Sequence, residues 1–414
     1  MSCVPRALIA ATEQLGIKVG TGRMHPSVEF DSQFDTNPGS LPSERRYQDL
    51  FLSIRPGVNI EYPTPQLELK TNLAFEYRRY LGIDSELTRR LSSFLGRALV
   101  EAQFNPQGHV RLHIANSFIR HAEPGNQTFY HRLLHSQNET TAQVDMIPFG
   151  GALKFAVEYS YFFDYYDRTT INAALEPRAL DNTRHRLSPQ ITWKFLPKTA
   201  LILDGNFLQT DYNNVPFGNS DLVNSDSKSF SGTLGAIGNL TRKTTLTLKF
   251  GYERLLIINP STRNEQTNQW LVTTTFTYQM SETGQFQFDY TRDNQPTSLF
   301  QYVSANTATI AYEQQILGEF NALCKLSYGY NTFGEAITTP DSGAILPRRK
   351  DQRFTATLEF SYALFPWARL SLHPSYEKLV SNFVPEANST EDVTSPSTVN
   401  YERFAIFFRL QMRY

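Results

Sequence analysis

Few residues of this chain could do chemistry, and they are widely spaced. His131 and His135 stand four positions apart, a spacing that would place two metal ligands on one side of a helix. A metal site would also need that segment to be helical and a carboxylate nearby. We expect instead that both histidines face solvent in a long outer loop, and we predict no metal site and no cofactor.

Catalytic side chains are equally sparse. Asp204, Asp211, His113 and His373 are of the types that a barrel enzyme would use, but nothing in their spacing brings them together. The chain contains no Gly-x-Ser-x-Gly elbow, no phosphate-binding loop and no dinucleotide fingerprint. We therefore predict that the protein is not an enzyme and has no catalytic residue.

The composition narrows the class of protein. With 39 Lys and Arg against 40 Asp and Glu, the net charge of −1 gives no electrostatic reason to expect a nucleic-acid partner. No run of about 18 apolar residues is present, which excludes a spanning helix. The two cysteines, Cys3 and Cys324, form no disulfide framework. Abundant Tyr and Phe in a polar chain are typical of a membrane β-barrel, whose strands alternate lipid-facing and lumen-facing residues.

Alternation of this kind runs along nearly the whole chain. Between Leu67 and Tyr77 the odd positions carry Leu, Leu, Thr, Leu, Phe and Tyr, while Glu68, Lys70 and Glu76 stand between them. Such a strand has one apolar and one charged face. Charged groups that faced a packed core would be strongly unfavourable, whereas charged groups that face a wet lumen are not.

The pattern predicts an all-β fold, an antiparallel transmembrane barrel of about 18 strands, with a count uncertain by about two. The segments lie near residues 24–34, 48–62, 66–80, 93–104, 109–121, 138–147, 152–166, 184–195, 199–212, 228–240, 243–254, 268–280, 284–292, 302–314, 319–331, 351–365, 367–379 and 401–414.

Short and long connections alternate between these segments. Tight links such as 63–65 and 365–366 follow every second strand, and longer ones rich in Asn, Ser, Pro and Asp follow the others. Outer-membrane barrels have short periplasmic turns and long outer loops, so we place both termini in the periplasm. The outer loops that we expect to narrow the lumen lie near 121–137, 167–183, 332–350 and 380–400.

We divide the chain into an N-terminal periplasmic segment, residues 1–23, and one barrel domain, residues 24–414. The apolar run from Ala7 to Ala11 is too short for a secretory signal, so we expect a mature or shortened start. The last segment alternates from Phe404 to Tyr414 and ends on the aromatic residue. We expect it to be read by the outer-membrane assembly machinery, and we expect the barrel to contact outer-membrane lipid and lipopolysaccharide.

Several stretches resemble a family of β-barrel porins found with bacterial exopolysaccharide export loci. The similar stretches are Met24 to Asn37, Tyr302 to Tyr312, Ala322 to Tyr330, Arg349 to Asp351, Phe354 to Tyr362, Trp367 to Tyr376, and Ser381 with Asn382. The resemblance implies a channel in the bacterial outer membrane that carries a growing glycan and acts with periplasmic export components. This chain differs in having no periplasmic helical repeat domain.

Strand parity predicts which charged side chains line the pore. The set mixes both signs, which suits hydrated solutes of little net charge, and pairs within it could equally brace the wall. Its members are Arg55, Glu68, Lys70, Glu76, Arg97, Glu101, Arg111, Lys154, Glu158, Arg184, Arg186, Asp204, Lys249, Asp289, Lys325, Glu359, Arg369, Arg403 and Arg409.

Aromatic residues divide by the same parity. An interfacial girdle is predicted from Tyr62, Tyr77, Phe163, Trp193, Phe195, Trp270, Tyr278 and Trp367. Phe51, Phe162 and Phe407 have inward parity, where they would fill space in the lumen or stack on sugar rings.

Three functions remain open from the sequence. The first is export of an exopolysaccharide across the outer membrane, and the second is a general or sugar-selective diffusion porin. The third is a closed barrel that acts as a receptor or structural protein. The sequence does not give the transported molecule, the direction of transport, the oligomeric state or the open width of the lumen.

Overall fold

The computed structural model of the protein is built almost entirely from β-strands. It describes residues 16–43, 46–83, 92–124, 132–167, 177–213, 215–216, 223–258, 265–297, 302–316, 318–334, 348–383 and 399–414. Within these ranges no helix is long and apolar enough to span a bilayer. Two short 3-10 turns, η2 (Phe149–Gly151) and η3 (Pro177–Leu180), are the helical elements of the same ranges.

Eighteen strands form the wall, and a short strand, β1 (Ile17–Val19), precedes them. The wall strands are β2 (Gly22–Asp35), β3 (Asp49–Pro63), β4 (Leu67–Tyr80), β5 (Ser93–Phe104), β6 (Val110–Pro124), β7 (Arg132–Met146), β8 (Leu153–Tyr166), β9 (Asn182–Leu196), β10 (Thr199–Tyr212), β11 (Asp226–Asn239), β12 (Thr244–Ile258), β13 (Glu265–Gln279), β14 (Gly284–Pro296), β15 (Tyr302–Ile316), β16 (Phe320–Phe333), β17 (Lys350–Phe365), β18 (Ala368–Ser381) and β19 (Tyr401–Arg413).

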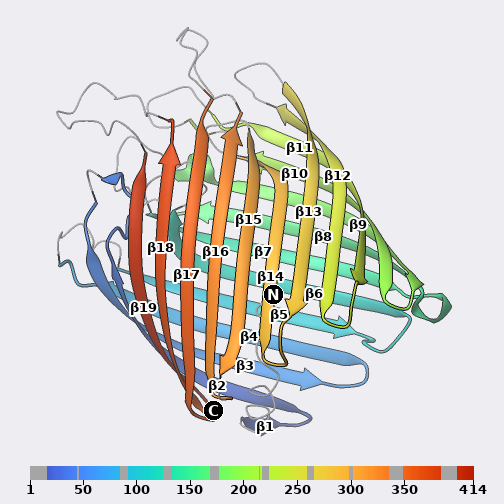
Figure 1. Ribbon diagram of the computed structural model, residues 1–414, viewed down its shortest axis with the longest axis horizontal. Helices are drawn as coiled ribbons and strands as arrows, with labels where there is room; N and C mark the ends of the chain where they lie inside the picture. Colours follow the sequence, from blue (N-terminus) through green and yellow to red (C-terminus); the bar gives the residue numbers. More distant parts are fainter. Residues whose placement is uncertain are drawn as a thin grey trace.

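The wall closes on itself, as the barrel prediction requires. Each strand from β2 to β19 pairs antiparallel with its neighbours in the chain, and β19 returns to pair with β2 (Figure 1). At this closing seam Leu410 lies opposite Phe30, and Phe408 lies opposite Ser32. Closure leaves no unpaired sheet edge, which an apolar strand such as β19 would otherwise expose.

The barrel begins slightly before the predicted boundary at residue 24. Strand β2 starts at Gly22, and β1 pairs antiparallel with its first residues, Ile17 with Met24 and Val19 with Gly22. Residues 16–23 therefore belong to the sheet, and residues 1–15 lie outside the described part of the chain. The backbone N–H of Tyr414 donates to the carbonyl of Pro26 at 3.0 Å, so the end of the chain is fixed beside the first strand.

Tight turns join alternate strands at one end of the barrel, here called the turn end. The link from β5 to β6 shows how the sequence makes such a turn. Asn105 adopts a left-handed φ of 52°, which Asn tolerates better than most residues, and its carbonyl accepts from the N–H of Gly108 at 2.9 Å. The opposite end, here called the loop end, carries the longer connections, most of whose residues lie outside the described ranges.

Several strands extend further toward the loop end than predicted. Strand β7 begins at Arg132 rather than near residue 138, and β14 ends at Pro296 rather than near residue 292. His135 is consequently a residue of β7 and only 3 % exposed, so the expectation that it faces solvent in a loop is wrong. His131 lies outside the described residues, as do residues 125–131, 168–176, 335–347 and 384–398 of the loops expected to narrow the lumen.

Candidate functional site

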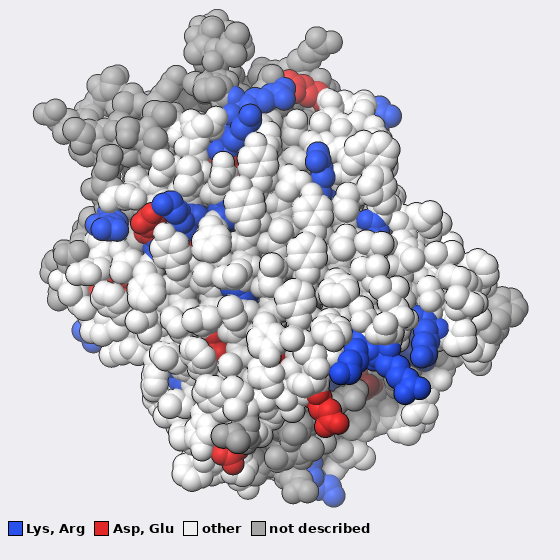
Figure 2. Space-filling model, viewed as in Figure 1, with Lys and Arg blue, Asp and Glu red and all other residues white. Residues whose placement is uncertain are grey.

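The two faces of the sheet have opposite chemistry. Large apolar side chains of one face are open to the surroundings, with Phe75 and Phe94 exposed by 70 % and 73 %. In the view of Figure 2, the middle of this face carries few charged atoms, and charged side chains gather toward its ends. This distribution matches the apolar band of an outer-membrane barrel.

The charged face is the concave one. The Nζ of Lys249 on β12 lies 2.6 Å from Asp204 Oδ2 on β10, so the two side chains meet across the intervening strand β11. Thr233 of β11 and Gln190 of β9 donate to the same carboxylate, at 3.1 and 2.7 Å. Side chains from four strands converge in this way only on the inside of a curved sheet. The charged face therefore encloses the lumen.

All nineteen charged residues predicted at the pore wall have the parity of this inner face. Ion pairs hold part of the set: Arg55, Lys70, Glu76, Lys154, Asp204, Lys249, Arg403 and Arg409, with Glu68 as the partner of Lys70. Glu359 lies beside His373, with 3.7 Å between the carboxylate oxygen and Nδ1. Others make no ion pair with any described residue: Arg97, Glu101, Arg111, Glu158, Arg184, Arg186, Asp289, Lys325 and Arg369.

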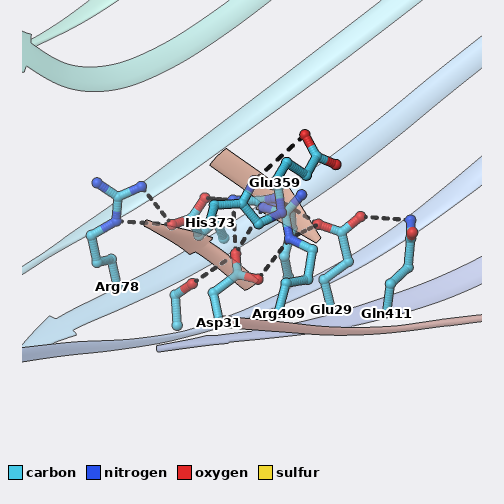
Figure 3. Close-up of polar contacts among 10 residues, drawn as sticks. Glu29, Asp31, Arg78, Glu359, His373, Arg409 and Gln411 are labelled. Carbon is cyan, nitrogen blue, oxygen red and sulfur yellow. Dashed lines mark hydrogen bonds and ion pairs between the residues drawn. The ribbon is translucent and has the colours of Figure 1, made fainter. Parts of the chain in front are cut away.

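Arg55 is the centre of a network of ion pairs on the described part of this wall. Figure 3 labels its members Asp31, Arg78 and Arg409. Arg55 lies on β3 and binds carboxylates from both adjacent strands, Glu29 at 2.6 Å and Asp31 at 3.3 Å on β2, and Glu76 at 2.6 Å on β4. Arg78 binds the second oxygen of Glu76 at 2.8 Å. The three carboxylates are 8 % exposed or less, so they depend on these guanidinium groups for their solvation.

The network continues across the closing seam. Arg409 of β19 donates from Nε to Asp31 at 2.8 Å, and Arg403 of the same strand binds Asp35 at 2.6 Å. Asp31 and Asp35 belong to β2, the first wall strand. Inner-face ion pairs thus join the two strands that are most distant in sequence.

Strand parity did not predict three acidic residues that take part in these ion pairs. Glu29, Asp31 and Asp35 were not among the predicted wall residues, although Phe30 and Phe34 between them are exposed apolar residues. The alternation within residues 24–34 places Glu29 and Asp31 on the inner face, and Asp35 has the same parity one residue beyond that segment.

A family model described as "Putative beta-barrel porin 2" matches residues 10–398, nearly the whole chain. The protein belongs to this family. It is an outer-membrane β-barrel porin, in agreement with the closed wall and its two faces. No curated protein matched the sequence.

Three solved structures are similar to this chain at low sequence identity. The outer membrane protein OpdK from Pseudomonas aeruginosa is 10 % identical, with a TM-score of 0.48 over 94 % of this chain and 99 % of its own. OccAB3 from Acinetobacter baumannii is 10 % identical, with a TM-score of 0.49 over 96 % and 100 %. The FrpB iron transporter from Neisseria meningitidis is 10 % identical, with a TM-score of 0.48 over 98 % and 83 %.

The three aromatic rings predicted to point inward, those of Phe51, Phe162 and Phe407, each lie against an arginine side chain. The guanidinium carbon of Arg78 lies 4.6 Å from the ring centroid of Phe51, and that of Arg184 lies 4.7 Å from the centroid of Phe162. The guanidinium carbon of Arg409 lies 4.9 Å from the ring centroid of Phe407. These contacts are cation–π interactions, which occupy one face of each ring. Phe51 and Phe407 thus lie against arginines of the ion-pair network, whereas Phe162 lies against Arg184, which makes no ion pair with a described residue.

Two of the three tryptophans lie where a girdle would need them. Trp193, Trp270 and Trp367 are exposed by 49 %, 56 % and 46 %; Trp193 lies near the end of β9 and Trp367 in the turn after β17, whereas Trp270 lies well inside β13. Tyr77, Phe195 and Tyr278 are exposed on the apolar face.

The candidate catalytic residues do not converge. Asp204 pairs with Lys249, whereas His373 on β18 lies 3.7 Å from Glu359 on β17. His113 is opposite Gln103 and Gln143 in the sheet. Within the described ranges, no three His, Cys, Asp or Glu side chains are arranged to hold a metal ion together.

Proposed function

We propose that this porin is a passive diffusion channel for small hydrated solutes that carry little net charge. An 18-strand barrel is too wide for its own side chains to fill, so its lumen holds water unless a loop enters it. The observation that carries the proposal is the pairing of charges on the inner wall. Arg55, Arg78 and Arg409 are matched by Glu29, Asp31 and Glu76.

Matched charges favour weak ion selectivity. A ring of one sign would attract one kind of ion and repel the other, whereas neighbouring charges of opposite sign cancel within a few ångströms. The predicted wall set alone holds more basic than acidic residues, and Glu29, Asp31, Asp35 and Asp145 reduce that excess because they pair with its cations.

A polar recess in the wall also supports solutes that form hydrogen bonds. It has a volume of about 290 Å³ and lies against β17, β18 and β19. Hydroxyl groups of Thr355, Thr357 and Ser375 line it, together with Glu377 and Arg403. Hydroxyl groups beside one acid and one base can bind sugar-like or zwitterionic solutes through both donors and acceptors.

A liposome-swelling assay with neutral sugars of increasing size tests this function. Proteoliposomes are transferred into isotonic solutions of a pentose, a hexose, a disaccharide or a trisaccharide. We expect swelling that is fastest for the pentose and slows with size. Liposomes prepared with heat-denatured porin are the control, and a failure of the folded porin to admit even the pentose would contradict the proposal.

Export of an exopolysaccharide is the second candidate, suggested by the family resemblance. It is favoured by a wide lumen and by inner rings such as Phe162 and Phe407, but Arg184 and Arg409 already lie against these rings. Under this alternative, a long glycan chain would enter the lumen and block the flux of small sugars. Unchanged pentose swelling in the presence of such a glycan favours diffusion alone.

A further inference from the structure

A buried group of polar side chains lies inside the barrel wall near the loop end, apart from the networks above. It consists of His121 on β6, His135 on β7, and Asp164 with Tyr166 on β8. His135 and Asp164 have side chains only 3 % and 4 % exposed. The diffusion function makes no use of these residues.

Asp164 holds one nitrogen of the His135 ring. Its carboxylate lies 2.7 Å from His135 Nδ1, and it also accepts from Gln137 Nε2 at 3.0 Å and from the Tyr166 hydroxyl at 3.3 Å. Because Nδ1 is engaged by this carboxylate, Nε2 is the ring nitrogen that remains to bind another group.

The Nε2 atom of His135 is buried and has no hydrogen-bond partner within the described part of the chain. A buried polar atom without a partner is unfavourable and calls for an explanation. The His135 ring stacks on Tyr166, with centroids 4.7 Å apart and planes 9° apart. This stacking and the bond that Asp164 accepts at Nδ1 hold the ring, so Nε2 cannot turn to find a donor elsewhere.

A second imidazole lies directly beside it. His121 is the cross-strand partner of His135, and the two ring centroids are 4.1 Å apart. Two histidines that face each other across antiparallel strands can supply two nitrogen ligands to one ion. A carboxylate that holds the other nitrogen of a ligating histidine is the usual surrounding of a metal-bound imidazole, and Asp164 provides it here.

We propose that His121 and His135 form a binding site for a divalent transition-metal ion, with Asp164 as the residue that positions His135. Imidazole nitrogen suits Zn²⁺, Cu²⁺ and Ni²⁺ and is a poor ligand for Ca²⁺ or Mg²⁺. Two protein nitrogens leave the remaining coordination positions to water. The site would place a bound ion at the loop end of the barrel.

Zinc titration of the folded porin in detergent tests the site, using a chain without a polyhistidine tag. We expect one Zn²⁺ ion per chain by isothermal titration calorimetry, and at least a tenfold loss of affinity in His121→Gln and in His135→Gln. Asp164→Asn should weaken binding by about 10–100-fold, because the ring loses its fixed orientation. His113→Gln is the matched control, since His113 is an inner-face histidine of the same strand β6, and it should bind as the wild type does.

Two outcomes would overturn the proposal: no saturable Zn²⁺ binding by the wild type, or equal binding by the double variant His121→Gln/His135→Gln. Electron paramagnetic resonance of the wild type with one equivalent of Cu²⁺ needs no variant. We expect the signature of two nitrogen ligands, and a spectrum without nitrogen coupling would contradict the site even if the variants fail to fold.

Discussion

Arg409 on the last strand of the barrel donates its Nε–H to Asp31 on the first wall strand, at a distance of 2.8 Å. The two residues are 378 positions apart in sequence and adjacent in the closed sheet. Two residues further along β19, Gln411 donates to Glu29 at 2.9 Å. The seam is thus held by side-chain bonds inside the lumen as well as by the backbone ladder.

Removal of the Arg409 side chain should weaken closure. We expect Arg409→Met to lower the free energy of unfolding by about 1.5–3 kcal/mol, the usual contribution of a hydrogen bond to a charged group. Urea titration in detergent, followed by the fluorescence of the three tryptophans, measures this. Arg369→Met on the neighbouring strand β18 is the control, because Arg369 makes no ion pair with any described residue. Equal losses in the two variants would show that the seam contact contributes nothing.

Arg55→Met should have two separate effects. The substitution leaves Arg78 and Arg409 as the guanidinium groups that bind Glu29, Asp31 and Glu76, so the free energy of unfolding should fall. It also removes one positive charge from the inner wall. Arg97→Met also removes one positive charge from the inner face, yet Arg97 is exposed and unpaired within the described chain. We expect both variants to shift the reversal potential toward cations, and only Arg55→Met to unfold at lower urea. Loss of stability in Arg97→Met to the same extent would argue against the network.

Ion selectivity should respond to inward charges alone. Lys325→Glu changes the inner face by two charge units, and we expect a shift of the reversal potential in a KCl gradient toward cation preference. Lys228→Glu makes the same change on β11 with the parity of the exposed Phe230, on the outer face. Its reversal potential should equal that of the wild type. A similar shift in both variants would mean that parity does not decide which side chains face the pore.

The carboxyl group of Asp181, at the loop end of the barrel, should make the stability of the protein depend on pH. It lies between η3 and β9, where burial raises the pKa of its carboxyl above the usual 3.8 although the Tyr166 N–H donates to it at 2.8 Å. Because the folded state holds this proton more tightly than the unfolded state, stability should fall as pH rises from about 3.8 through the raised pKa. In Asp181→Asn this fall should be absent, as measured by urea titrations from pH 4 to pH 8. An unchanged pH profile in the variant would contradict the assignment.

The strands were predictable because lipid imposes the alternation. Strands such as β19, from Phe404 to Met412, have an outward apolar row, and this row is what the sequence displays. Outside the bilayer no lipid imposes the alternation, although the strands remain paired through their backbones. The sequence pattern therefore predicts the start of β7 too late and places His135 in a loop. Parity could predict the face of Arg409 but not its partner, since the register between β19 and β2 depends on how the whole barrel closes.

Conductance in a planar bilayer tests the central claim most directly. A single wild-type porin in symmetrical KCl should open as discrete, ohmic current steps, and its reversal potential in a KCl gradient should lie near zero, because acidic and basic groups are mixed on the inner wall and its central network is paired. A barrel that inserts and carries no current, or one with strong preference for a single ion, would contradict an open lumen with matched charges.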